Sequence, residues 1–438
     1  MPSNLADWLA YLESLHPKTI ALGLERVDKV RKRLNLEPDF PLIVVGGTNG
    51  KGSACAMLES IFYAAGYRVG CYTSPHLLTY NERVRIGKQM VSDEALCASF
   101  EKIEQARKLG PRLRGDDEFV EISLTYFEFG TLAAMQLFIE QKVDVAILEV
   151  GLGGRLDAVN AFDGDCAIVT SVDIDHTDYL GDTIEKIGFE KAGIFRRDCV
   201  AIFSGEDAPR SLVEHAENIG AKLWCIGREF GYTAHQGQWD FQGVSGKRSA
   251  LPFPALRGAF QLNNASAVLA GLDAIRERLP VNMQAVRRGL GEVELAGRFQ
   301  FVPGKPQLIL DVAHNPHAAR ALAQNLESLP PCPHTYAVFA MLKDKDAMGV
   351  IEALDAHVDT WLVAGIAATR GASSDELASL LGRAGIREKF ICFADAQKAL
   401  MHACNVAGEN DRIVAFGSFY TVAHVMTAVH DGLVRHIP

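Results

Sequence analysis

A glycine-rich stretch between an apolar run and a helical pattern constrains the fold of this chain more than any other feature. Residues 46–58 read GGTNGKGSACAML, directly after FPLIVV. A strand that enters a glycine-rich turn and then a helix directs backbone N–H groups and the positive helix end at one point, which suits phosphate oxygens. The usual phosphate loop has a glycine, four residues and then Gly-Lys-Ser/Thr. Here Val45 replaces the first glycine and Gly52 follows Lys51, so the hydroxyl moves to Ser53.

The alternative for this stretch is a glycine-rich turn between a strand and a helix that binds no ligand. Pairs of glycines alone would not decide between the two. The combination Thr-Asn-Gly-Lys-Gly-Ser between a strand and a helix favours a phosphate loop.

Short apolar runs alternate with longer helical patterns, which predicts an α/β fold with mostly parallel sheets. In the first part of the chain, the runs that predict strands are PLIVVGG, YRVGCYT, VDVAILEVG, DCAIVTSV and CVAIFS. The polar, glycine-rich region 227–258 predicts irregular structure or short antiparallel strands. The segment QLNNASAVLAGLDAIRERL then predicts a helix, with Asn263 or Asn264 near its N-terminus, where such side chains cap well.

The length of 438 residues favours two domains. After GEVELAGRFQFVPGKPQ the alternation starts again with QLILDVAH, TYAVFAML, DTWLVAGI, KFICFAD and RIVAFGS, each followed by a helical segment. This pattern predicts a second, doubly wound domain of the Rossmann-like kind. We place the boundary near Leu295, which gives a phosphate-loop domain at 1–294 and a Rossmann-like domain at 295–438.

Composition and charge narrow the possible partners. The net charge of −10 argues against a nucleic-acid-binding surface, so a polyphosphate ligand has to be held by local features and metal ions. The nine cysteines include no C-x-x-C pair, which favours reduced thiols in a cytoplasmic protein. The first residues carry Asp7 and Glu13 and do not resemble a signal peptide. The apolar stretch from Ile413 contains His424 and Asp431 and predicts a strand, a turn and a buried helix, so we expect no membrane span.

Charged side chains follow several of the predicted strands. Glu149 ends the apolar run VDVAILE, and His176 follows AIVTSV. If their strands are parallel neighbours of the strand before the glycine-rich loop, Lys51, Glu149 and His176 meet at one carboxyl edge, where α/β proteins bind ligands. A buried carboxylate needs a partner, which is either a metal ion or Arg155. A single histidine is more often satisfied by hydrogen bonds in the core.

Two further positions are ambiguous from the residues alone. Lys191, in FEKAGI, is typical of a solvated helix lysine beside Glu190. Asp311 and His314, in LILDVAHNP, end a strand before a helix, so they are either ligand contacts at a carboxyl edge or a helix cap and a surface histidine.

Taken together, these motifs resemble the folate branch of the Mur ligase superfamily, which comprises folylpolyglutamate synthases and the bacterial bifunctional form that is also a dihydrofolate synthase. The displaced hydroxyl of GTNGKGS is similar to the loop of these amide ligases. The other matching motifs are SPHL, ERVRI, LTYFE, EVGLGGRLDA, DHTDYLG, EKAGIF and DVAHNP. The resemblance runs from about Pro17 to the last helix, in the family's order and spacing.

The resemblance implies a reaction in which ATP phosphorylates the carboxylate of dihydropteroate or a reduced folate and the amine of L-glutamate attacks the acyl phosphate. LTYFE is similar to the bifunctional form, so both activities are implied, in a cytoplasmic monomer. A monofunctional folylpolyglutamate synthase is the alternative. A Mur-type peptide ligase is less favoured, because only one or two helices fit before the loop. A non-catalytic phosphate-loop protein would not need Lys191, Asp311 and His314.

The resemblance also assigns roles by position, with Mg²⁺ at two sites. The implied ATP contacts are Thr48, Asn49, Gly50, Lys51, Gly52 and Ser53, together with Asn264, Arg298 and Asp311 across the domain cleft. The implied metal ligands are Ser74, Glu149, His176 and Lys191, the last as a carbamate. The implied pterin pocket consists of Thr125, Tyr126, Phe127, Glu128, Leu156, Asp157 and Ala158. Catalytic roles fall to Lys51, His176, Lys191 and His314, with His314 and Ser418 near the incoming glutamate.

Overall fold

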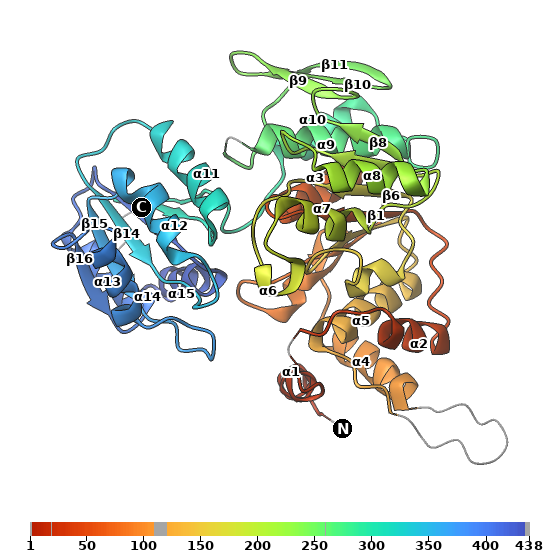
Figure 1. Cartoon of the computed structure of the whole chain (residues 1–438), viewed down its shortest axis with the longest axis horizontal. Coiled ribbons are helices and arrows are strands. Elements are labelled where there is room, and N and C mark those ends of the chain that lie inside the picture. Colours follow the sequence, from red (N-terminus) through yellow and green to blue (C-terminus); the bar gives the residue numbers. More distant parts are fainter. Residues whose placement is uncertain (1, 19, 109–120, 259, 434–438) are drawn as a thin grey trace. The chain divides into compact units, whose positions relative to one another are not determined.

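The computed structural model describes residues 2–18, 20–108, 121–258 and 260–433. The chain divides into two compact units, one made of 1–254 and 262–293 and the other of 255–261 and 294–438 (Figure 1). Each unit has its own sheet and its own hydrophobic core, as expected of a domain.

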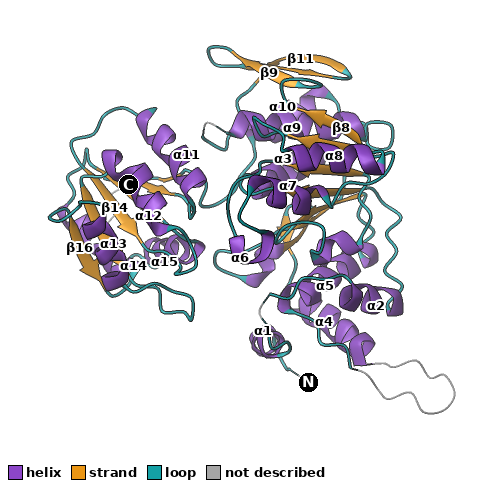
Figure 2. Cartoon of the chain, in the orientation of Figure 1, coloured by secondary structure: helices purple, strands orange, loops and turns teal. Residues whose placement is uncertain are grey.

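The first unit is built on an eight-stranded sheet with the order β4-β3-β2-β5-β1-β6-β7-β8. Neighbouring strands from β2 to β8 are parallel, and β3 and β4 continue the β2 edge in antiparallel fashion. Apart from Glu149 and the edge strand β8, the parallel strands are apolar, because helices cover both faces of the sheet (Figure 2). The strands are β1 Leu42–Gly46, β2 Val69–Tyr72, β3 Val84–Ile86, β4 Gln89–Met90, β5 Val145–Glu149, β6 Cys166–Val169, β7 Val200–Phe203 and β8 Lys222–Cys225.

Helices of several lengths surround this sheet, and two short 3-10 helices lie in its loops. The helices are α1 Leu5–Ser14, α2 Glu25–Arg33, α3 Lys51–Ala64, α4 Asp93–Lys108, α5 Tyr126–Glu140, α6 Thr177–Leu180, α7 Ile184–Ala192, α8 Arg210–Ile219, α9 Gln261–Ala274 and α10 Met283–Gly291, and the 3-10 helices are η1 Tyr80–Arg83 and η2 Ala158–Ala161.

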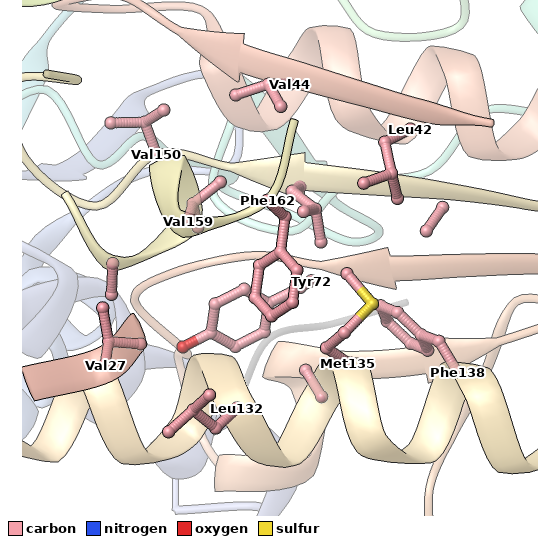
Figure 3. Packing of buried hydrophobic residues seen from close by; sticks show 14 of the residues in the cluster. Val27, Leu42, Val44, Tyr72, Leu132, Met135, Phe138, Val150, Val159 and Phe162 are labelled. Atoms are coloured by element: carbon pink, nitrogen blue, oxygen red, sulfur yellow. The ribbon is translucent and has the colours of Figure 1, made fainter. Parts of the chain in front are cut away.

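The core between the sheet and α5 is built from alternate strand residues. Leu42 and Val44 of β1 belong to one buried cluster with α5, because successive side chains on a strand point to opposite faces. Figure 3 shows the Tyr72 ring of β2 directed toward Leu132 of α5 in this layer, with Met135 and Phe138 further along the same helix. This packing fixes the sheet against α5 and so fixes where the N-terminus of α5 lies.

The sequence of 227–258 left irregular structure and short antiparallel strands as alternatives, and the structure shows antiparallel strands. It contains a three-stranded sheet with the order β11-β10-β9, made of β9 Gly231–Ala234, β10 Trp239–Gly243 and β11 Gly246–Leu251. Both asparagines proposed as caps lie inside the first turn of α9, which begins at Gln261. The Oδ1 atom of Asn263 accepts a hydrogen bond from the hydroxyl of Tyr232, at 2.9 Å.

The second unit is a six-stranded sheet with the order β12-β13-β17-β14-β15-β16, parallel except for β12 at one edge. The strand order reverses direction around β17, the arrangement of doubly wound nucleotide folds. Its strands are β12 Gln300–Val302, β13 Gln307–Leu310, β14 Thr335–Phe339, β15 Thr360–Ala364, β16 Phe390–Phe393 and β17 Arg412–Phe416. Its helices are α11 Pro316–Glu327, α12 Ala347–Leu354, α13 Ser374–Arg383, α14 Ala396–Val406 and α15 Phe419–His430, with the 3-10 turn η3 Asp355–His357.

The α/β class and every strand-like run named in the sequence analysis are confirmed by this structure. The sequence analysis did not predict β8, whose four residues KLWC are short and mostly not fully buried. In the described ranges, no helix has both the length and the apolar character that crossing a bilayer demands.

We predict that Gly289→Ala destabilises the first unit by about 1–3 kcal/mol, because a Cβ at this position would lie 2.5 Å from the Cα of Ile61 where α10 packs on α3. The matched control is Gly291→Ala at the end of the same helix, where a Cβ meets nothing within 4 Å. Urea unfolding of both variants measures the difference. Equal midpoints for the two variants would contradict the close helix contact.

Candidate active site

The glycine-rich loop follows β1 and leads directly into α3. Gly47 (φ +142°) and Gly50 (φ +87°) adopt backbone conformations that residues with a side chain rarely adopt. A Cβ at Gly50 would also lie 2.6 Å from the Oδ1 of Asn264. Asn264 therefore lies against the loop within the first unit, so its predicted contact with ATP would come from the same unit as the loop.

The loop is tied to the segment that follows β6. The N–H of Thr48 donates to the carbonyl of Ser171 at 2.8 Å, and the N–H of Asn49 donates to the Ser171 hydroxyl at 3.0 Å. The hydroxyl of Thr170 donates to the carbonyl of Asn49 at 2.6 Å, and the N–H of Asp173 donates to the Thr48 hydroxyl at 3.0 Å. These bonds fix the loop against the segment that follows β6.

Lys51 lies at the first residue of α3, and its ammonium group turns back over the loop. It donates to the carbonyls of Gly47 and Thr48 at 3.0 and 3.2 Å. Burial lowers the pKa of Lys191, and the positive charge of Lys51 lowers it further. Burial raises the pKa of Asp157, and the charge of Lys51 opposes this rise. Lys51 therefore acts electrostatically on both Lys191 and Asp157.

Glu149 ends β5, next to β1 in the sheet, and its register partner is Val45. Glu149 is 4% exposed, and its Oε2 accepts a hydrogen bond from the N–H of Ser74 at 3.0 Å. The alternative that Arg155 pairs with Glu149 is wrong, because Arg155 forms its ion pair with Glu190 at 2.8 Å. The structure thus places Ser74 and Glu149 together, as a metal site shared by the two would require.

Three groups after β6 extend the site. His176 has a left-handed backbone (φ +53°) and directly precedes α6, and its Nε2 lies 4.0 Å from the Oδ2 of Asp175. Lys191 of α7 is 3% exposed, so the interpretation as a solvated lysine was wrong. Burial and the Lys51 charge lower the pKa of Lys191 to about 7, against an opposing effect of Asp175. Asp175 received no role from the sequence, although it follows the strand as closely as His176 does.

The residues present suit a divalent cation that arrives with a nucleotide. In the described ranges, no three His, Cys, Asp or Glu side chains are grouped so that they could hold a metal unaided. Mg²⁺ in nucleotide sites needs only one or two carboxylates, because phosphates and water complete its shell. The buried carboxylate of Glu149, with Ser74 hydrogen-bonded to it, meets that requirement.

The segments predicted to bind the pterin come together beside α5. Thr125 and Glu128 cap this helix mutually, with N–H to oxygen distances of 2.8 and 3.2 Å, and Glu128 pairs with Arg26 at 2.9 Å. A Cβ at Gly151 would lie 2.7 Å from the Phe127 ring, so the loop after β5 runs directly over this ring. Thr125 and Glu128 therefore shape this region, whereas Tyr126 and Phe127 lie less deeply buried beside it.

The loop after β5 is organised by Asp157. The carboxylate of Asp157 accepts the N–H groups of Leu152 and Val159 at 2.9 and 3.0 Å. Burial raises its pKa to about 7, although these backbone donors act in the opposite direction. The carbonyl of Leu156 accepts the N–H of Gly23 at 3.1 Å, and Ala158 is buried. The segment around Gly23 had no role in the sequence analysis; its only signal was glycine in IALGLERV.

The predicted residues of the second unit also converge, within that unit. Asp311 accepts the N–H groups of Phe299 and Ala313 at 2.9 and 2.8 Å, so it is not the cap of α11, which is Asn315. Burial raises the pKa of Asp311, and Arg298 opposes this effect. The Arg298 guanidinium lies 5.2 Å from the centre of the Phe419 ring.

His314 lies beside the Phe419 ring, and Ser418 directly precedes Phe419 in the chain. The His314 ring is 6.2 Å from the Phe419 ring, and its Nδ1 lies 2.9 Å from the carbonyl of Val312. The Ser418 hydroxyl caps α15 by accepting the N–H of Thr421 at 3.0 Å. His314 is partly buried, which makes the interpretation as a simple surface histidine wrong.

One buried ion pair beneath the site was not predicted. Arg85 of β3 binds Glu59 of α3 at 2.9 Å, with side chains 17% and 6% exposed. Its guanidinium also donates to the Thr73 hydroxyl at 3.1 Å and to the Glu82 carbonyl at 2.6 Å. Arg85 therefore connects the helix that begins at Lys51 with the strand end that carries Ser74.

Two family models match the chain in the order of its two units. The Mur ligase middle domain matches residues 45–272, and the Mur ligase glutamate ligase domain matches residues 297–419. The chain is also 45% identical over 428 residues to the dihydrofolate synthase/folylpolyglutamate synthase of Escherichia coli K12, covering 98% of this chain and 96% of that protein. The chain belongs to the dihydrofolate synthase/folylpolyglutamate synthase family of Mur ligases. A family member from Haemophilus influenzae is 41% identical over 98% of both chains.

Solved structures of this family superpose over nearly the whole chain. E. coli FolC in complex with DHPP and ADP has a TM-score of 0.90 at 44% identity, covering 98% of this chain and 99% of that one. A bifunctional folylpolyglutamate synthase/dihydrofolate synthase with Mn, AMPPNP and L-glutamate bound has a TM-score of 0.87 at 45% identity, covering 98% of each. The fold is therefore that of the family in both units.

We predict that Arg85→Met lowers the free energy of unfolding by about 3–5 kcal/mol, because it leaves the Glu59 carboxylate buried without its cation. The double variant Arg85→Met/Glu59→Met removes both charges and should recover part of this loss. Urea unfolding of the two variants and the wild type gives the comparison. A double variant less stable than Arg85→Met would show that the charge pair is not the main contribution.

Proposed function

We propose that this chain is an ATP-dependent ligase that joins L-glutamate to dihydropteroate, forming dihydrofolate, and to reduced folates, forming folylpolyglutamates. The observation that carries this function is 45% identity, over 98% of the chain, to the bifunctional E. coli enzyme. The ligands of related structures, namely DHPP with ADP and AMPPNP with Mn and L-glutamate, support the same substrates.

The chemistry proceeds through an acyl phosphate. An oxygen of the acceptor carboxylate attacks the γ-phosphorus of ATP, and ADP leaves. The amine of L-glutamate then attacks the acyl carbon, loses a proton, and expels inorganic phosphate as the amide forms. The first step brings two anions together, so positive groups in a partly dry site lower its barrier most.

The loop and Lys51 supply that positive potential. N–H groups at the start of α3 and the Lys51 ammonium bind the β- and γ-phosphates. The proposed ATP contacts in the first unit are Thr48, Asn49, Gly50, Lys51, Gly52, Ser53 and Asn264. Of the second-unit residues, Arg298 and Asp311 are proposed contacts of ATP, and His314 and Ser418 are proposed contacts of L-glutamate.

Ser74, Glu149 and His176 would hold the divalent cation that accompanies ATP, and a second site would use Lys191. Bound Mg²⁺ would neutralise phosphate charge and polarise the phosphorus under attack. Glu149 is buried beside Ser74, which supports its assignment as the main carboxylate ligand.

Lys191 is proposed to act as a carbamate. Its side chain is 3% exposed, and within the described residues its ammonium group makes no hydrogen bond or ion pair. A buried cation in that situation is costly, so the neutral amine is favoured. The neutral nitrogen adds to CO2 and releases a proton, which turns a cationic side chain into an anionic ligand.

The acceptor's pterin is proposed to bind where α5 begins and the loop after β5 passes over it. Tyr126 and Phe127 offer aromatic faces, and Thr125, Glu128, Leu156, Asp157 and Ala158 shape the surrounding backbone. In this assignment 1–294 binds ATP and pterin and 295–438 binds glutamate. We further propose a monomer that acts in the cytoplasm.

We predict that release of phosphate from ATP requires L-glutamate and an acceptor together, and that both dihydropteroate and tetrahydrofolate serve as acceptors. Malachite-green assays with each component omitted measure this requirement. With an acceptor labelled by ¹⁸O in its reacting carboxyl, one labelled oxygen should appear in phosphate. If tetrahydrofolate but not dihydropteroate serves as an acceptor, the chain is instead a monofunctional folylpolyglutamate synthase. Turnover of ATP without any acceptor would refute the proposed ligase activity.

We predict that Lys191→Ala lowers kcat by at least about 100-fold while ATP binding stays measurable, because the carbamate acts on the reaction more than on nucleotide affinity. The matched control is Lys186→Ala on the same helix, whose side chain is 62% exposed and pairs with Asp182. Turnover and calorimetric ATP binding are measured for both. Wild-type rates in Lys191→Ala would exclude the carbamate role.

A further inference from the structure

A cluster of one arginine, two tyrosines and one histidine lies between the Ser74 segment and the start of α5, and of these four residues only Tyr126 belongs to the proposed pterin pocket. The Nε of Arg83 donates to the Nδ1 of His76 at 2.8 Å. The Arg83 guanidinium carbon lies 5.3 Å from the centre of the Tyr80 ring and 5.5 Å from that of the Tyr126 ring. We call these four residues the Arg83 cluster.

All partners of the Arg83 side chain in the described residues are neutral. Because the Nδ1 of His76 accepts the hydrogen bond from Arg83, this nitrogen carries no proton, and the imidazole in this contact is the neutral form. The nearest acid in the chain, Glu82, accepts three backbone N–H groups, from Leu77, Leu78 and Thr79, at 2.7 to 2.8 Å. Within the described residues, no hydrogen bond or ion pair of the two Nη groups of Arg83 is found.

The other arginines around this region are neutralised by carboxylates. Arg26 pairs with Glu128, Arg85 with Glu59, and Arg155 with Glu190, each at 2.8 or 2.9 Å. Arg83 alone of these four arginines has a positive charge with no compensating anion among the described residues. A half-buried guanidinium held between aromatic rings is weakly hydrated and binds a carboxylate well, because its two Nη groups match two carboxylate oxygens.

The cluster is rigid and close to the candidate reaction centre. Tyr80 is 3% exposed, and its ring packs edge-to-face against Phe100 and Tyr126, at 5.9 and 5.7 Å. The carbonyl of Arg83 accepts the N–H of Thr73 at 2.9 Å, and the next residue, Ser74, is bound to Glu149. Arg83 therefore lies beside the strand end that carries Ser74 and at the start of α5.

The two acceptor types differ in the number of carboxyl groups near the reaction centre. Dihydropteroate has one carboxyl, and it reacts. A folate ends in glutamate, so a second carboxylate remains three carbon atoms from the reacting one. A cation that lies beside the reaction centre, rather than at it, is placed to bind that second, non-reacting carboxylate.

We infer that the guanidinium of Arg83 binds the non-reacting α-carboxylate of the terminal glutamate of folate acceptors, and that Arg83 thereby determines acceptor specificity. This inference rests on the proposed function. His76 and Tyr80 are positioning residues that hold the guanidinium for this contact. Dihydropteroate, which has no such carboxylate, does not use it.

The test is a comparison of kcat/KM for three acceptors: dihydropteroate, tetrahydrofolate, and a tetrahydrofolate analogue with an α-carboxamide and a free γ-carboxyl. Arg83→Gln should lower kcat/KM for tetrahydrofolate by at least about 10-fold, the usual effect of a lost charged hydrogen bond. Its effect on dihydropteroate should stay below about threefold. The amide analogue should be as poor a substrate for the wild type as for Arg83→Gln. For tetrahydrofolate, the kcat/KM of Arg83→Lys should lie between the values of the wild type and Arg83→Gln.

The matched control is Lys88→Gln, which removes one positive charge from the turn between β3 and β4, where the lysine contacts Tyr63 and the Glu292 carbonyl. It should leave the ratio of the two kcat/KM values unchanged. Equal losses with dihydropteroate and tetrahydrofolate in Arg83→Gln would overturn the inference, because the arginine would then serve the common carboxyl or the fold. A wild type inactive with both acceptors would instead overturn the proposed function.

Discussion

Three parallel strands, β5, β1 and β6, end side by side at one edge of the first sheet, and the groups of the candidate site follow those ends. In this register Val45 lies beside Glu149 and Gly46 beside Val169. Lys51 follows β1, Glu149 ends β5, and the segment leading to His176 follows β6. A slip of one residue in any strand would turn its apolar set toward the wrong helix layer, so the cores on the two faces of the sheet hold the site in register.

Charge balance is the second constraint on this site. Carboxylates and cations are mostly paired away from the reaction centre, as in Arg85–Glu59 beneath it and Arg155–Glu190 beside it. Lys191 and Arg83 differ from these pairs, because each has a positive or ionisable nitrogen with no carboxylate bound to it in the described part of the chain. A buried amine without a partner is suited to modification, whereas a guanidinium stacked on two rings is suited to an anionic ligand.

The sequence was most informative where chemistry depends on local order. The stretch GGTNGKGS predicted a loop between a strand and a helix, and the structure has this loop, in which Gly47 and Gly50 adopt a backbone that only glycine adopts readily. The position of Glu149 at the end of an apolar run was enough to place it at the carboxyl edge once the strand order was known. Lys191 and Arg155 were misjudged from the residues alone, because burial and pairing depend on α7 packing against the loop after β5.

By itself, the sequence determined the α/β class, most of the parallel strands, the loop type and the family resemblance, because these follow from residue patterns within one segment. The tertiary structure decided which side chains are neighbours: Asn264 against the loop, Gly23 against Leu156, and Arg83 between Tyr80 and Tyr126. Apart from the contact between Arg83 and its near neighbour Tyr80, these contacts join segments that are far apart in the sequence, and no local pattern encodes such a pairing. The physical reason is that packing of the sheet and its helices, rather than local propensity, brings the segments together.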